Sequence, residues 1–125
     1  MTISRAQAVT LGALAVVAVV ALQAFNSFAC YQHDFQSFVD ATVQFVAPAL
    51  VVALVCLAFP NPLRAVVACA FFAPWLVIAY FADCVSPGKD ASLSYVAVLL
   101  WGTASALVGA FLGARVATGM GFRIK

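Results

Sequence analysis

Four long stretches without a single charged residue limit what this chain can fold into more than any other feature does. They contain 28, 23, 18 and 24 residues and are bounded by Arg5 and Asp34, Asp40 and Arg64, Arg64 and Asp83, and Asp90 and Arg115. A helix that crosses the hydrocarbon core of a membrane needs about 20 apolar residues at a rise of about 1.5 Å each. Each stretch can supply one span, and none is long enough for two. We predict four transmembrane helices, near residues 6–26, 41–59, 63–83 and 92–114.

The composition excludes the main classes of soluble protein. Apolar residues make up 66% of the 125 residues and charged residues 8%, whereas soluble domains average about 45–50% and about 25%. A small domain leaves much of its surface exposed, so soluble enzymes, nucleic-acid-binding domains and disordered regulators are excluded. A membrane β-barrel would alternate polar and apolar residues, which residues 14–21 do not. We predict an all-α integral membrane protein, a four-transmembrane-helix bundle that forms one domain over residues 1–125.

The charges predict the orientation of this bundle. With four spans, one side of the membrane holds five basic and no acidic residues: Arg5, Arg64, Arg115, Arg123 and Lys125. The other side holds Lys89 and the four aspartates, Asp34, Asp40, Asp83 and Asp90. Because Lys and Arg concentrate in cytoplasmic loops, we expect both termini to be cytoplasmic, in a bacterial inner (plasma) membrane. The loops over residues 27–40 and 84–91 then face outward.

The cysteines fit this orientation. Cys30 and Cys84 fall in or beside the two outer loops, on the side where disulfides persist. We predict a Cys30–Cys84 bond, with two unpaired thiols as the alternative. Cys56 and Cys69 fall inside the second and third helices, and we expect them to stay reduced.

The first outer loop carries an aromatic pattern. Phe28, Tyr31, Phe35 and Phe38 recur at spacings of three and four, which indicates a short amphipathic segment on the outer interface. We favour an aromatic belt that anchors the loop; a lid or a docking face is the alternative. At the other end of the chain, residues 115–125 are expected to lie against anionic cytoplasmic lipid or to dock on a partner.

The fourth helix carries the clearest packing signal. Small residues recur every four positions and include a GxxxG pair: Ser105, Gly109, Gly113, Ala117 and Gly121. A second small row lies beside it: Gly102, Ala106, Ala110 and Ala114. Small residues let helices approach closely in lipid. Either one row faces another subunit, or both rows pack inside the bundle.

Two tryptophans and a set of polar residues complete the candidates for a site. Trp75 and Trp101 are expected to be neighbours at one depth, with Thr103 or a carbonyl freed by a proline kink as a hydrogen-bond acceptor. Polar residues fall near one level toward the outer end: Gln23, Gln44, Tyr80, Asp83 and Tyr95. We favour a hydrogen-bonded plug for this outer polar cluster; the mouth of a pore is the alternative.

Catalytic chemistry finds little support in the sequence. No ionisable residue lies deep in a span, which argues against a proton-coupled pump. Cys30, His33 and Asp34 are residue types that can bind a metal ion. The predicted disulfide would use the Cys30 thiol, so we do not favour a metal site here. We expect no catalytic residue, no metal and no cofactor.

These observations leave two functions. We expect a non-enzymatic subunit or accessory and assembly component of a membrane complex, which packs through its fourth helix. Its partners would be the lipid bilayer and either a second copy or a larger membrane protein, with no nucleic acid. The alternative is a homo-oligomeric channel, transporter or holin-like pore.

Overall fold

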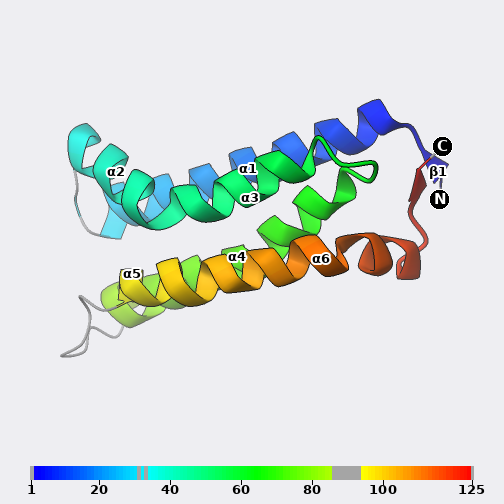
Figure 1. Cartoon of the computed structure of the whole chain (residues 1–125). Helices are drawn as coiled ribbons and strands as arrows, with labels where there is room; N and C mark the ends of the chain where they lie inside the picture. The colour runs from blue at the N-terminus through cyan, green and yellow to red at the C-terminus, as the bar shows by residue number, and fades with distance from the viewer. Residues whose placement is uncertain (1, 31, 33, 86–93, 125) are drawn as a thin grey trace.

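The computed structural model describes residues 2–30, 32, 34–85 and 94–124, without the side chains of Cys30, Asp83, Val85, Ser94 and Tyr95. Most of this chain is helical (Figure 1). The structure confirms four helices that are long and apolar enough to cross a membrane: Arg5–Ala29, Phe35–Cys56, Leu63–Tyr80 and Val98–Gly119.

Each of these helices contains, or continues into, a five-residue π-helical segment, labelled η. The order is β1 (Thr2–Ile3), α1 (Arg5–Phe25), η1 (Asn26–Cys30), α2 (Phe35–Ala41), η2 (Thr42–Val46), α3 (Ala47–Cys56), α4 (Leu63–Tyr80), η3 (Phe81–Val85), α5 (Ser94–Ala97), η5 (Val98–Gly102), α6 (Thr103–Gly119) and β2 (Arg123–Ile124). All four π-helical segments lie toward the end of the bundle that holds α2 and α5 (Figure 1).

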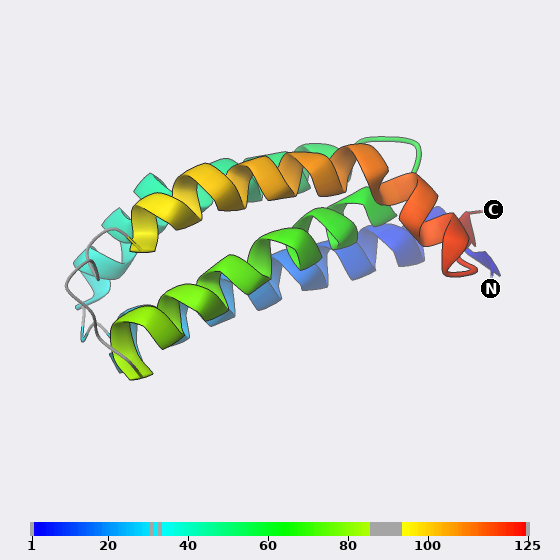
Figure 2. The ribbon, with the colours of Figure 1, turned by 90° about the horizontal axis from the view of Figure 1, so that it is seen from below.

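Helix α4 is the centre of the bundle. It contacts α1, α3 and α6, and Figure 2 shows α1 running alongside α4 and α3 alongside α6. Along its length α4 buries several small residues, including Ala65, Ala68 and Ala79, with Phe72 and Leu76 filling the space between the helices. Small side chains let backbones approach closely, so dispersion contacts hold the helices together in lipid.

The second helix begins at Phe35, six residues before the predicted start. Asp34 caps it, because its Oδ1 accepts a hydrogen bond of 2.8 Å from the Ser37 N–H. Asp40 lies inside the helix, where it accepts a bond of 3.0 Å from the Gln36 amide. The prediction took Asp40 as an end of the span, but a charged side chain in the first turns of a membrane helix can reach the headgroups.

The predicted amphipathic segment is therefore not a separate element. Phe28 lies in η1 at the end of the first helix, and Phe35 and Phe38 lie in α2 at the start of the second. The Phe28 and Phe38 rings stack with their centroids 5.0 Å apart, which joins the two helix ends. Tyr31 lies outside the described residues.

A short turn that contains Pro60-Asn61-Pro62 links α3 to α4. Helix α3 ends at Cys56, three residues earlier than expected, and residues 57–59 form a turn. The Asn61 Oδ1 accepts a bond of 3.1 Å from the Leu63 N–H at the start of α4. Arg5 donates to the carbonyls of Ala58 and Pro60 at 3.4 and 3.3 Å, so the start of α1 is tied to this turn.

The C-terminal segment differs most from expectation. Helix α6 continues to Gly119, and Gly121 then adopts a φ of 92°. The N–H of Phe122 bonds the Ala117 carbonyl at 2.9 Å, and that of Gly121 bonds the Thr118 carbonyl at 3.0 Å. These two bonds form a Schellman motif, which turns the chain back from the helix end.

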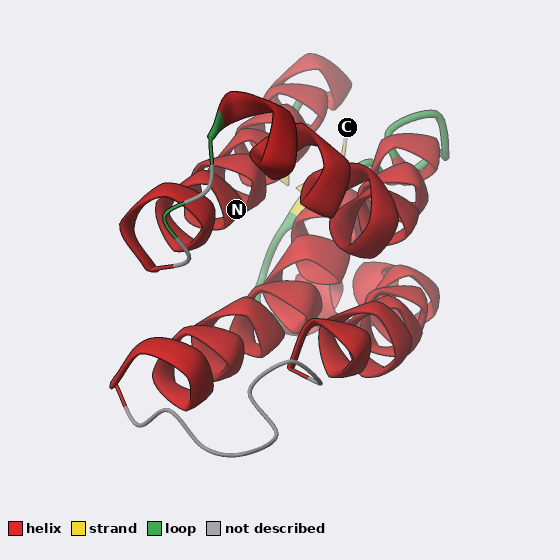
Figure 3. Cartoon of the chain, turned by 90° about the vertical axis from the view of Figure 1, so that its left-hand side faces the viewer, coloured by secondary structure: helices red, strands yellow, loops and turns green. Residues whose placement is uncertain are grey.

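The turned segment pairs with the N-terminus. Strand β2 runs parallel to β1, with Ile3 opposite Ile124, and Ile3 is buried beside Leu63 and Phe122. Residues 115–124 therefore continue a helix and join a small core, and the expected contact of this segment with lipid or with a partner stays a prediction. Figure 3 looks along the spans from the end with α2 and α5, and these strands lie at the far end.

Candidate functional site

The small-residue row of the fourth helix faces α4 of the same chain. A Cβ atom on Gly109 would lie 2.9 Å from the Val67 carbonyl oxygen, and one on Gly113 would lie 2.7 Å from the Arg64 Cα. Ala117 is buried in the same direction. Within the predicted row, Ser105 is half-buried, and only Gly121 is exposed, at the helix cap.

The second small row also faces the interior. Gly102 lies against the Phe72 ring, and Ala106 is buried. Ala110 and Ala114 are half-buried. Both rows therefore pack inside the bundle, which is the second of the two arrangements that the sequence left open. Any surface that α6 offers to another molecule is therefore built from residues outside these two rows.

The outward face of α6 and η5 forms an exposed stripe that we call the tryptophan face. It consists of Trp101, Ala104, Val108 and Leu112, spaced by three and four residues so that they share one side of the helix. Trp101 is 62% exposed, and Val108 and Leu112 are 49% and 41% exposed. In a bilayer this stripe faces lipid or a partner.

The two tryptophans are neighbours, as the sequence predicts, but their surroundings differ. Their ring centroids lie 6.5 Å apart with an interplanar angle of 19°. The indole N–H of Trp75 donates to the Ser105 hydroxyl at 2.9 Å. This acceptor replaces the predicted Thr103, whose own Oγ1 is buried without a partner among the described residues. The indole N–H of Trp101 makes no hydrogen bond within the described part of the chain.

The tryptophan pair lies inside the spans, toward the end of the bundle that holds α2 and α5. Trp75 lies five residues before Tyr80, where its span ends, and Trp101 lies three residues after Val98, where its span begins. At about 1.5 Å per residue these positions are about 8 Å and about 5 Å inside the spans. Because Trp101 stacks on Trp75, its exposed indole lies at a similar depth.

A second polar group is buried where α1 becomes η1. Gln23, Asn26 and Ser27 are fully buried. The Gln23 amide donates to the Ser27 hydroxyl at 3.2 Å, and the Asn26 amide donates to the Leu76 carbonyl at 3.1 Å. The Asn26 Oδ1 has no partner among the described residues. Asn26 and Ser27 were not predicted as members of a polar group, although their spacing from Gln23 places all three on one helix face.

The predicted outer polar cluster is not assembled as one unit in the described residues. Gln23 is buried, whereas Gln44 is exposed. Tyr80 is half-buried, with its ring centroid 5.4 Å from that of Phe25. The side chains of Asp83 and Tyr95 lie outside the described residues. Of the three predicted members whose side chains are described, only Gln23 belongs to the buried polar group.

The four cysteines fall into two pairs by their position in the helices. Cys56 and Cys69 are buried and free. Cys84 lies in η3, and the side chain of its predicted partner Cys30 lies outside the described residues, so their disulfide stays a prediction. His33 is also outside them. The described residues contain no group of three or more His, Cys, Asp or Glu side chains that could hold a metal ion.

No family model, curated protein or solved structure matches this chain. Its function is therefore argued from its own residues. Among these, the tryptophan face combines a large exposed apolar surface with an indole N–H that has no acceptor among the described residues.

Proposed function

We propose that this protein is a non-enzymatic subunit or accessory component of a membrane complex, and that it binds its partner through the tryptophan face. The observation that carries the proposal is the exposed Trp101 indole, which lies inside the span and whose N–H has no acceptor among the described residues. The partner is a membrane protein with a transmembrane helix that presents a hydroxyl, amide or free carbonyl at this depth.

The two indoles differ in whether their N–H group has an acceptor. A polar group moved from water into an apolar medium without a hydrogen bond costs about 2–7 kcal/mol. The chain satisfies Trp75 with the Ser105 hydroxyl but leaves Trp101 exposed beside it. A buried tryptophan usually finds a partner for its N–H, which is why tryptophan is enriched at interfaces. Ala104, one turn along the same face, leaves room for a second helix to approach.

The same proposal includes the orientation in the membrane. The described basic residues are Arg5 at the start of α1, Arg64 at the start of α4, Arg115 late in α6, and Arg123 in β2. These positions lie toward the end of the bundle where β1 and β2 pair. The excess of Arg in cytoplasmic segments supports a cytoplasmic location for this end, in a bacterial inner membrane.

A homo-oligomeric pore is the second candidate. The buried group of Gln23, Asn26 and Ser27 favours it, because a pathway needs polar groups along its wall. This group occupies one end of the bundle, whereas the core around Ala53, Cys69 and Ala106 is apolar. We therefore place the subunit function first.

The test uses the complex purified from its own membrane in mild detergent. Trp101→Phe keeps the aromatic ring and removes the N–H, so it should weaken the partner contact by the worth of one hydrogen bond, about 0.5–1.5 kcal/mol, or about 2- to 12-fold in affinity. Trp75→Phe is the matched control, since it removes an N–H that Ser105 already satisfies within the chain. The measurement is the amount of partner recovered with each variant.

The possible results separate the two functions. Reduced recovery with Trp101→Phe and unchanged recovery with Trp75→Phe would support the subunit function. Equal recovery with both variants would show that the tryptophan face does not hold the partner. A complex whose mass is a whole multiple of 13.1 kDa, with no other protein, would favour the homo-oligomer, and a liposome flux assay would then test for a pore.

A further inference from the structure

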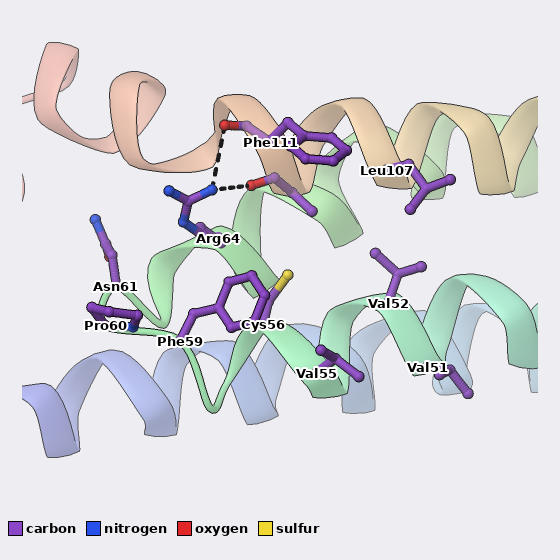
Figure 4. A pocket seen from close by; sticks show the side chains of 11 residues that line it. Val51, Val52, Val55, Cys56, Phe59, Pro60, Asn61, Arg64, Leu107 and Phe111 are labelled. Atoms are coloured by element: carbon purple, nitrogen blue, oxygen red, sulfur yellow. Dashed lines mark hydrogen bonds between the residues drawn. The ribbon is translucent and has the colours of Figure 1, made fainter.

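A groove of about 430 Å³ opens between α3 and α6 (Figure 4). Its walls are apolar: Val51, Val52 and Val55 line it from α3, and Leu107 and Phe111 line it from α6. These residues form a different side of α6 from the tryptophan face. Ligand pockets commonly measure about 300–1,000 Å³, so the groove is large enough to hold part of a ligand.

One end of the groove is polar and positively charged. Arg64, the second residue of α4, lies there, and its Nη1 donates to the Ala110 carbonyl at 2.8 Å and the Phe111 carbonyl at 3.4 Å. Its guanidinium carbon lies 5.9 Å from the centroid of the Phe59 ring. These contacts fix the guanidinium group at the end of the groove, opposite Val51 and Leu107 (Figure 4).

The guanidinium group keeps donors for a ligand. Apart from those at Nη1, its N–H groups make no hydrogen bond within the described residues, and it has no carboxylate partner among them. Asn61 lies at the same end, and its Oδ1 is already used by the Leu63 N–H. Arg5 adds a second cation, because it bonds the carbonyl of Pro60, which lines the groove.

The groove therefore has the polarity of a lipid site. A phosphate matches the fork of an arginine and its positive charge. Arg64 lies at the start of a span, which is the level of the headgroups, and the apolar walls lead from there toward the interior of the span. An acyl chain attached to a phosphate at Arg64 would run in the same direction.

We propose that this groove binds an anionic phospholipid, with one acyl chain between α3 and α6 and the phosphate on Arg64. The inference is independent of the proposed partner, because it concerns the isolated chain and another side of α6. Basic groups near a membrane surface each strengthen the attraction to anionic lipid by about fivefold. A fixed arginine with free donors should contribute at least that much.

The test is native mass spectrometry of the purified chain in mild detergent, titrated with an equal mixture of phosphatidylglycerol and phosphatidylcholine that carry the same acyl chains. The measured quantity is the ratio of the two lipids bound. Arg64→Gln should lower this ratio about fivefold. Arg123→Gln removes the same charge from an exposed position in β2, outside the groove, and should lower the ratio less than Arg64→Gln does.

A second pair of variants tests the groove without touching the charge. Val55→Trp fills the groove, while Leu54→Trp introduces the same side chain at the neighbouring position, which is similarly exposed but does not line it. We expect Val55→Trp to lower the ratio as far as Arg64→Gln does, and Leu54→Trp to leave it unchanged. This pair decides the question even where Arg64→Gln fails to fold.

Two outcomes would overturn the proposal. Equal losses with Arg64→Gln and Arg123→Gln would mean that lipid responds to the overall charge of this end of the bundle. A wild-type ratio in Val55→Trp would mean that the groove is not the site. Either result leaves the tryptophan-face proposal unaffected, because that test measures recovery of a protein partner.

Discussion

Replacement of Gly113 by alanine tests the packing of α6 on α4 most directly. A Cβ atom at this position would lie 2.7 Å from the Arg64 Cα. Ordinary van der Waals contacts begin at 3.4 Å, so the two helices would have to separate locally by about 0.7 Å. The obstacle is the backbone of another helix, which cannot rotate away as the end of a side chain can.

The expected loss of stability follows from two opposing effects. Overpacking of a tight interior costs about 1–3 kcal/mol, and a backbone obstacle places this site at the upper end of that range. Alanine gains up to about 1 kcal/mol over glycine in helix propensity. We therefore expect Gly113→Ala to lower the free energy of unfolding by about 2 kcal/mol. The hydrogen bonds from Arg64 to the carbonyls of Ala110 and Phe111 would be displaced by the same movement.

Gly119→Ala provides the matched control. A Cβ atom on Gly119, near the end of the same helix, would meet nothing within 4 Å, so this change should be neutral or stabilise by about 0.5–1 kcal/mol. The assay is reversible unfolding in mixed micelles by titration with sodium dodecyl sulfate, followed by far-UV circular dichroism. Unfolding of Gly113→Ala and Gly119→Ala at the same denaturant fraction would contradict the close approach of α6 to α4 at Gly113.

Two further predictions concern the ends of the spans. Alkylation of the denatured, unreduced chain should label two thiols, Cys56 and Cys69, if Cys30 and Cys84 form a disulfide; four labelled thiols would reject that bond. Gly121→Ala should destabilise the chain by about 1 kcal/mol, because its φ of 92° strains a residue with a side chain, and a thermal unfolding midpoint equal to that of the wild type would argue against the Schellman cap.

The sequence predicted the number of spans better than their ends. Uncharged stretches located four helices because hydrocarbon excludes charge over about 20 residues. The same rule misplaced two boundaries, since Asp40 and Arg115 both lie inside helices. Side chains near the ends of a span can extend toward the headgroups. The pairing of β1 with β2 was missed because two-residue strands carry no periodic signal.

Single-helix patterns also leave the partner of a surface undetermined. The row that contains Gly109 and Gly113 was recognisable as a packing surface, but its spacing is the same whether the neighbour is α4 or another chain. The stacking of Trp75 and Trp101 followed from counting residues along each helix. The choice of Ser105 over Thr103 as acceptor depends on the rotation of α6 about its axis, which those counts do not determine.

The position of α4 explains why this small chain presents two separate surfaces. Helix α4 contacts every other span, so the small residues of α6 are used to bring α6 onto it. With about 100° between successive residues of a helix, the remaining large residues of α6 fall on two sides. Trp101 and Val108 lie on one side, and Leu107 and Phe111 lie about 90° away beside the groove. A partner helix on the tryptophan face and a lipid in the groove would therefore contact different residues of α6.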